Sequence, residues 1–261
     1  MIDSHIHIGQ FYDIYTTSTE IKDFLVSVGV DKCAISSTTI CEENYAKVIE
    51  EIQTFISEFG AANVFPILWI TPQMIKNNAL NLFLNSGIVW RCLKIHPQLH
   101  PKGWLVRGKN FRVLIELARK MHLPILIHTG ADDCCHAGKY LKLIKRNADI
   151  NFILAHGRPL NEALEVLAAC PNAYVDTAFM SVDSIVELCN RGFSSRVLWG
   201  SDVPIPLYFF RNSPSFDMRE YYLSQIEDLK SRVTFADFEL VSEMNFSRVF
   251  CSVESKENLC V

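Results

Sequence analysis

The chain repeats one short pattern eight times, and this repetition limits the folds that it can adopt. Each repeat opens with a short apolar, β-rich run, and successive runs start roughly 30 residues apart, the length of a strand–helix–strand unit. Strands that alternate with helices pair in parallel, so the pattern predicts a parallel sheet covered by helices. The predicted strands are Ile2–Ile8, Lys32–Ser37, Val64–Ile70, Arg91–His96, Pro124–Thr129, Asn151–His156, Ala173–Thr177 and Arg196–Ser201.

The segments between these strands carry apolar residues at helical spacing. Thr17 followed by Glu20 is a capping-box signature, and the apolar stripe after it ends at Gly29. Residues 45–59 repeat the pattern. Eight such units in about 260 residues favour a closed (β/α)8 barrel over an open sheet, slightly distorted because the seventh unit is short. Phe235–Phe250 is predicted to form an extra C-terminal helix.

Composition indicates a globular protein and excludes several other classes. Of 261 residues, 49% are apolar and 21% are charged, which suits a chain with a large core. No linker divides the chain, so we expect one domain over residues 1–261. The net charge of −4 argues against sequence-independent nucleic-acid binding. No apolar run approaches the roughly 20 residues of a membrane helix, and no signal peptide is visible.

The nine cysteines are scattered along the chain and include no Cys-x-x-Cys pair. The adjacent residues Cys134 and Cys135 are the one close pair. An odd number of dispersed cysteines is typical of free thiols in a reducing compartment. We therefore expect a cytoplasmic protein without structural disulfides.

Histidines and one aspartate fall at the ends of the predicted strands, where barrel enzymes carry their catalytic groups. His5 and His7 are two residues apart, so a strand points both rings to one face. The same alternation turns Lys94 and His96 into the barrel, and strand ends also supply His128, His156 and Asp202. Buried imidazoles and a carboxylate are costly to leave unpaired, and together they are suitable ligands for Zn²⁺, Mn²⁺ or Fe²⁺. A His-x-His pair alone is weak evidence, because it also occurs as a strand cap.

Five short segments carry a family resemblance, and they are Asp3-Ser4-His5-Ile6-His7, Leu93-Lys94-Ile95-His96-Pro97, Ile127-His128-Thr129-Gly130, Leu154-Ala155-His156-Gly157-Arg158 and Gly200-Ser201-Asp202-Val203-Pro204. They resemble the amidohydrolase superfamily, and within it the amidohydrolase-related branch of TIM-barrel metal-dependent hydrolases. The resemblance covers essentially the whole chain and extends to the closing helix around Asn245–Phe250.

The resemblance implies a catalytic metal held by His5, His7, His128 and Asp202, with Asp202 also acting as general base. His156 would bind a second metal, or else polarise or protonate the substrate. In two-metal relatives a strand-four lysine is carboxylated and bridges both ions, whereas other one-metal relatives lack such a lysine. For this chain we favour one ion, zinc before manganese or iron. Two roles stay open for Lys94: a carboxylated ligand that bridges two ions, or an inward lysine that pairs with Asp202 or with a substrate carboxylate.

Candidate substrate-binding residues lie in the loops that follow the strands. Arg158 suits a carboxylate or phosphate because its guanidinium binds such groups with two parallel hydrogen bonds, and a surface ion pair with the next helix is the alternative. His96 and His136 are further candidates. Aromatic residues after the first and eighth strands form a candidate substrate wall or simply pack together. They are Phe11, Tyr12, Tyr15, Tyr208, Phe209 and Phe210.

The ligand set predicts a hydrolase that cleaves an amide, ester or lactone bond of a small molecule with metal-activated water. The alternative is a metal-dependent non-oxidative decarboxylase of a small aromatic or unsaturated acid. A metal-dependent deoxyribonuclease is disfavoured, because such enzymes carry Gly-Glu-Ile-Gly where this chain has Leu-Lys-Ile-His-Pro. We expect a small-molecule substrate, no membrane or nucleic-acid partner, and a homodimer as the default assembly.

Overall fold

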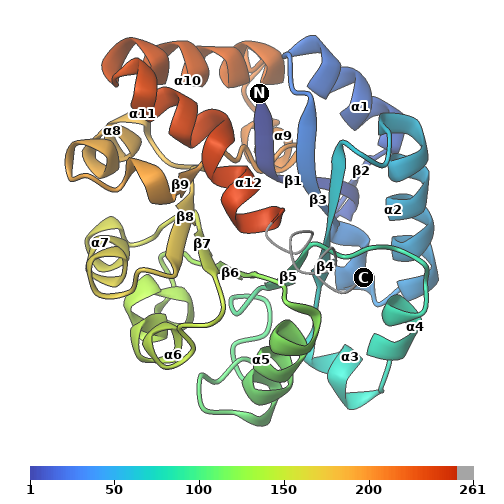
Figure 1. The fold of residues 1–261 in the computed structure, drawn as a ribbon. Coiled ribbons are helices and arrows are strands. Elements are labelled where there is room, and N and C mark those ends of the chain that lie inside the picture. Colours follow the sequence, from blue (N-terminus) through green and yellow to red (C-terminus); the bar gives the residue numbers. More distant parts are fainter. Residues whose placement is uncertain (252–261) are drawn as a thin grey trace, which may run out of the picture.

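The computed structural model describes residues 1–251 and confirms the predicted barrel (Figure 1). Within these residues, eight parallel strands follow one another around a ring in chain order, and helices surround them. A ninth strand, β2 (Ile14–Thr16), pairs antiparallel with the end of β1 and was not predicted. The barrel strands are β1 (Ile2–Phe11), β3 (Lys32–Ser37), β4 (Val64–Trp69), β5 (Cys92–Ile95), β6 (Ile125–His128), β7 (Phe152–Ala155), β8 (Ala173–Asp176) and β9 (Val197–Leu198).

The last strand is shorter than the sequence pattern suggested. β9 covers two residues, and the chain after it continues beside β1 without regular strand pairing. Three backbone hydrogen bonds close the ring there: Ser4 N donates to Trp199 O over 2.8 Å, Asp202 N to His5 O over 2.8 Å, and His7 N to Val203 O over 2.7 Å. This irregular closure brings Asp202 directly beside the two histidines of β1.

Helices form where the apolar spacing predicted them. At the first, Thr17 accepts from Glu20 N and the Glu20 carboxylate accepts from Thr17 N, which confirms the capping box. The larger helices are α1 (Ser18–Ser27), α2 (Tyr45–Phe59), α5 (Lys109–Met121), α7 (Leu160–Ala169), α8 (Val182–Asn190) and α10 (Met218–Arg232). Shorter ones are α3 (Pro72–Lys76), α4 (Leu80–Leu84), α6 (Leu141–Arg146) and α9 (Ile205–Phe210). Single 3₁₀ turns occur at Thr38–Glu42, Asp133–Cys135, Ala137–Tyr140 and Ser194–Arg196.

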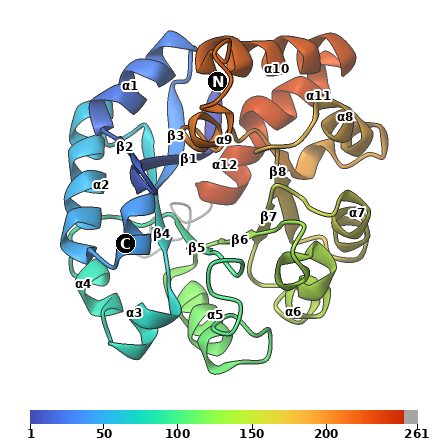
Figure 2. The ribbon, with the colours of Figure 1, turned by 180° about the vertical axis from the view of Figure 1, so that it is seen from behind.

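The C-terminal helical segment lies across one end of the barrel. It consists of α11 (Phe235–Glu239), a π-helical turn (Leu240–Met244) and α12 (Asn245–Phe250). The side chains of Phe246 and Phe250 stack at 4.4 Å, and Phe65 of β4 packs edge-on against Phe246 at 4.7 Å. Figures 1 and 2, which view the molecule from opposite sides, show α12 over the middle of the strand ring. The amino ends of the strands are thereby covered.

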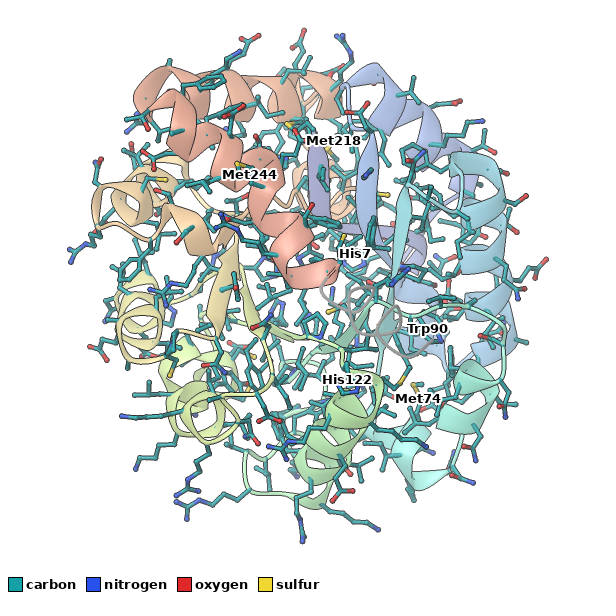
Figure 3. All side chains as sticks on the ribbon, in the orientation of Figure 1. His7, Met74, Trp90, His122, Met218 and Met244 are labelled. Carbon is teal, nitrogen blue, oxygen red and sulfur yellow. The ribbon has the colours of Figure 1, made fainter. Side chains whose placement is uncertain are left out.

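Two apolar layers hold the fold together. One lies between the strands and the outer helices, and the other fills the barrel interior under α12. Figure 3 shows His7 within the ring of strands, whereas His122 lies at the end of α5. No helix in residues 1–251 combines the length and hydropathy needed to cross a membrane. With the amino end covered, the polar side chains at the carboxyl ends of the strands face the open end.

Candidate metal centre

Three side chains far apart in the sequence converge at the carboxyl ends of the strands. The Nε2 atoms of His5 and His7 lie 3.2 Å and 3.0 Å from Oδ1 of Asp202. All three residues are buried, and one ligand atom from each lies within 4.8 Å of the others. Strand alternation explains the two histidines, and the backbone bond from Asp202 N to His5 O places the carboxylate. Two imidazoles and one carboxylate make up a common donor set for zinc and related ions.

The protonation states of these groups also suit a cation. Burial, followed by the charge of Lys94, lowers the pKa of His7 to about 3, so its imidazole is neutral at pH 7. Burial alone would raise the pKa of Asp202, but the neighbouring imidazoles of His5, His7 and His156 hold it below its usual range. A carboxylate and a neutral imidazole are the forms that bind a metal. The residues present therefore fit a divalent ion.

Asp176, at the end of β8, positions one of these ligands and was not predicted as a site residue. Its Oδ2 lies 2.9 Å from His5 Nδ1, and both side chains are fully buried. Its Oδ1 accepts hydrogen bonds from the backbone N–H groups of His156 and Ala178. A carboxylate that accepts from Nδ1–H leaves Nε2 of the same ring free to bind a metal. Its place at a strand end was the available signal in the sequence.

Replacing Asp176 with asparagine is expected to weaken metal binding about 10- to 100-fold, because the amide no longer fixes the His5 ring with a negative charge. Competition against a chromogenic zinc chelator measures this change. Asp183→Asn on α8 is the control, since that aspartate is exposed and pairs with Arg232. An affinity equal to that of the unmodified protein would contradict the role given to Asp176.

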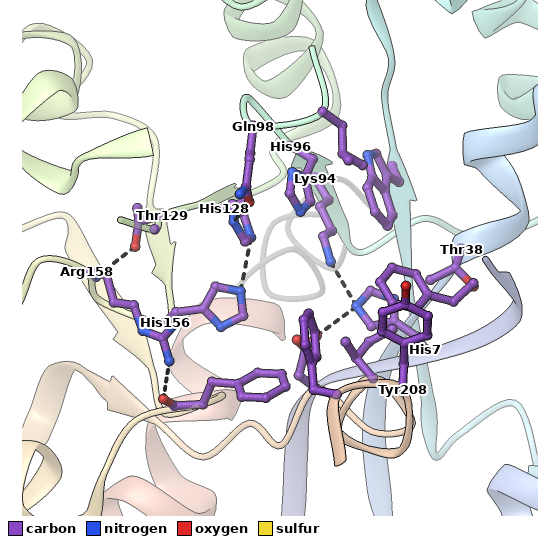
Figure 4. Close-up of a pocket in the computed structure, with 18 of the residues that line it drawn as sticks. His7, Thr38, Lys94, His96, Gln98, His128, Thr129, His156, Arg158 and Tyr208 are labelled. Atoms are coloured by element: carbon purple, nitrogen blue, oxygen red, sulfur yellow. Dashed lines mark hydrogen bonds and ion pairs between the residues drawn. The ribbon is translucent and has the colours of Figure 1, made fainter. Parts of the chain in front are cut away.

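Lys94 of β5 stands among the same imidazole nitrogens. Its Nζ lies 2.8 Å from His5 Nε2 and 3.0 Å from His7 Nε2, and 4.4 Å from the centre of the Trp69 ring (Figure 4). Burial lowers the pKa of Lys94 to about 8. The amine is thus close to losing its proton, and it occupies the space where a cation would meet the two histidines.

His128 and His156 form a second pair next to this group. His156 Nε2 lies 3.1 Å from His128 Nδ1, and the rings of His5 and His156 are 5.5 Å apart. His128 is not among the three residues whose ligand atoms converge, so the fourth ligand implied by the resemblance lies one imidazole away. His96 stacks on His128 at 3.6 Å and on Trp69 at 5.5 Å. Together these rings surround Lys94 and the candidate metal position.

The hydrogen-bond contacts of His128 and His156 require more ring protons than two neutral imidazoles carry. His156 Nδ1 faces Ala178 O at 2.9 Å, and His128 Nε2 faces Gln98 Oε1 at 3.0 Å, so both ends of the pair meet acceptors. Gln98 is fixed in this orientation because its Nε2 donates to Asp132. Three contacts need three ring protons, but two neutral imidazoles carry two. A proton or a metal ion on one ring nitrogen would remove the conflict.

A cavity of about 860 Å³ opens above the histidines. Among the lining residues within 1–251, Asp202 is the one acidic residue, whereas Lys94 and Arg158 supply positive charge. Arg158 Nη2 donates to Phe179 O, and within residues 1–251 this guanidinium makes no ion pair. Glu162, the first acidic residue of the following helix α7, binds His136 instead. The remaining lining is largely aromatic: Phe11, Tyr12, Trp69, Phe179, Tyr208, Phe209 and Phe210.

The other candidate substrate residues divide into two groups. His96 lines the cavity, as do five of the six aromatic residues singled out from the sequence. His136 does not line it: its Nδ1 lies 3.1 Å from Glu162 Oε1, and its Nε2 3.1 Å from Ala131 O. Tyr15 is also outside the lining, with Lys47 over its ring. Trp69 and Phe179 are lining residues that the sequence reasoning missed.

Comparison with known proteins places the chain in a family. The model of the family described as amidohydrolase matches residues 79–223, and no curated protein matches the chain in sequence. Among solved structures, a probable 2-pyrone-4,6-dicarboxylic acid hydrolase of Acinetobacter baumannii has a TM-score of 0.67 and 13% identity, covering 96% of this chain and 98% of its own. IDCase of Metarhizium anisopliae has a TM-score of 0.66 and 12% sequence identity, and the match covers 97% of both chains. The 4-oxalomesaconate hydratase of Rhodopseudomonas palustris has a TM-score of 0.62 and 14% sequence identity. This match covers 98% of this chain and 97% of the hydratase. These likenesses extend over the whole barrel, and the matched family model shows that the chain belongs to the amidohydrolase family.

Proposed function

We propose that this protein is a metal-dependent hydrolase that cleaves an amide, ester or lactone bond of a small molecule. The convergence of His5, His7 and Asp202 beside an 860 Å³ cavity carries this proposal. The three residues would hold one divalent ion, with zinc preferred and manganese or iron as substitutes. When bound, the ion would lower the pKa of water from 15.7 toward about 7 and polarise a substrate oxygen.

Asp202 is the proposed general base. Its low pKa keeps the carboxylate ionised at neutral pH, and it faces the two imidazoles at the floor of the cavity. It would take a proton from the attacking water and return it to the leaving group. His156, whose ring lies between His5 and His128, would donate a hydrogen bond to the oxygen that becomes negative once its Nε2 also carries a proton, because its Nδ1 already donates to Ala178 O.

Lys94 is proposed to remain an amine, with one ion at the centre. Its Nζ is within hydrogen-bonding distance of both metal-facing nitrogens, so an ammonium there competes with a cation. Its lowered pKa makes loss of that proton inexpensive near neutral pH. The neutral amine would then donate to the substrate or to Asp202.

The substrate is proposed to be an organic anion. Arg158 reaches the cavity with one backbone carbonyl as its hydrogen-bond partner, so most of its N–H groups are available for a carboxylate. The aromatic lining suits a planar or unsaturated body. The dicarboxylic acid in the name of the Acinetobacter baumannii structure is consistent with this class of ligand.

A reaction in ¹⁸O-labelled water tests the proposed chemistry. The metal-loaded protein is incubated with a panel of carboxylated lactones, cyclic amides and esters, and the products are weighed by mass spectrometry. Hydrolysis inserts one labelled oxygen into a product and stops when the metal is chelated. Release of carbon dioxide without incorporation of label would instead identify a decarboxylase and contradict the proposal.

A further inference from the structure

The adjacent cysteines Cys134 and Cys135 bring their sulfur atoms together in the loop between β6 and α6. The two Sγ atoms lie 3.5 Å apart. In an extended chain, neighbouring side chains point to opposite sides, but here the 3₁₀ turn Asp133–Cys135 places both sulfurs on one side. Cys134 is half-buried and Cys135 is fully buried. The pair thus has one accessible thiol with a second thiol directly behind it.

The backbone around the pair is held by several hydrogen bonds. Cys135 N donates to Asp132 O over 2.7 Å, and Gly130 N donates to Cys135 O over 3.2 Å. The Tyr140 hydroxyl donates to Cys134 O over 2.9 Å. Because the backbone of the pair is held and the two sulfurs already lie 3.5 Å apart, a ligand that binds both of them loses less conformational entropy than it would on a flexible loop. The pair is therefore arranged for a ligand whose central atom can bond to two sulfur atoms at once.

We propose that Cys134 and Cys135 form a bidentate binding site for trivalent arsenic compounds. The half-buried Cys134 reacts first: an S–As bond forms, an As–O bond breaks, and the thiol proton leaves with the hydroxyl as water. Cys135 then displaces a second hydroxyl in the same way. Two thiols and one organoarsenic dihydroxide, which is the hydrated form of the oxide, give a cyclic dithioarsenite and two waters. Arsenic stays trivalent, so no oxidant or reductant takes part.

The position of this site connects it to the catalytic cavity. The same loop supplies Gly130 and Ala131 to the cavity wall. Asp132 accepts a hydrogen bond from Gln98 over 2.8 Å, and Gln98 Oε1 lies 3.0 Å from His128 Nε2. Neither cysteine is among the described residues that line the cavity, so the pair lies on the same loop but apart from that lining.

The test uses the full-length reduced protein and phenylarsine oxide. Intact mass spectrometry is expected to show one adduct equal to one phenylarsenic group less two hydrogens, mapping to the peptide that contains residues 134 and 135. The adduct should survive excess 2-mercaptoethanol and be removed by 1,2-ethanedithiol. It should also raise the melting temperature, because a ligand that binds the folded state stabilises it.

Single substitutions distinguish two-sulfur binding from ordinary thiol labelling. Cys134→Ser and Cys135→Ser should each lose the adduct that resists 2-mercaptoethanol, whereas Cys41→Ser, at an exposed cysteine elsewhere, should keep it. If Cys135→Ser, at the buried position, does not fold, the result for Cys134→Ser alone tests two-sulfur binding. An adduct that retains a hydroxyl, maps elsewhere or persists in Cys134→Ser would overturn the proposal. None of these outcomes depends on the catalytic proposal.

Discussion

His7→Ala and His5→Ala are each expected to lose most of the bound metal and all measurable turnover. Each change removes one of the three ligand atoms that converge on the candidate metal position. The loss of affinity should exceed the roughly 10- to 100-fold expected for a residue that merely orients a ligand. Metal content by inductively coupled plasma mass spectrometry, together with a hydrolysis assay, measures both effects.

The matched control for these two variants is His100→Ala, because His100 lies outside the cavity lining. It should retain stoichiometric metal and normal activity. Circular dichroism confirms that the barrel is intact in each variant. Stoichiometric metal in His5→Ala or His7→Ala would show that the ligand assignment is wrong.

Asp202→Asn is expected to preserve the fold and to lower kcat by about 10²- to 10⁴-fold, the usual contribution of a general base. Asparagine has nearly the same size but cannot accept the proton, and it also removes a negative charge from between two imidazoles. Steady-state kinetics at saturating metal separates the loss of the base from any loss of metal.

Asp183→Asn serves as the control for Asp202→Asn, because its carboxylate is exposed on α8 and pairs with Arg232. It should leave kcat within experimental error of the unmodified protein. Near-normal turnover in Asp202→Asn at saturating metal would rule out Asp202 as the base.

The barrel could be predicted from the sequence because the strand–helix pattern is local and repeats along the chain. Strand alternation alone placed His5 and His7 on one face, and the same rule turned Lys94 inward. Asp202 is 195 residues from His7, yet its position followed from the rule that strand carboxyl ends meet at one rim of a barrel. The short β9 was not expected, because irregular backbone hydrogen bonds rather than strand pairing close the ring there.

The contacts between side chains were harder to predict. Whether His128 reaches the metal position or bonds to His156 depends on side-chain rotation, which strand periodicity does not determine. His136 turns away from the cavity because Glu162, 26 residues later, binds its ring. Asp176 was missed because its role is an interaction with His5 rather than with a ligand. Loop paths and hydrogen-bond partners therefore required the structure.

The measurement that tests the central claim most directly is an anomalous diffraction map from crystals grown with zinc. Our account predicts one strong peak within bonding distance of His5 Nε2, His7 Nε2 and the Asp202 carboxylate, with Lys94 Nζ displaced from its present contacts. A map with no peak at these atoms, in crystals where zinc binds elsewhere, would contradict the proposed metal centre.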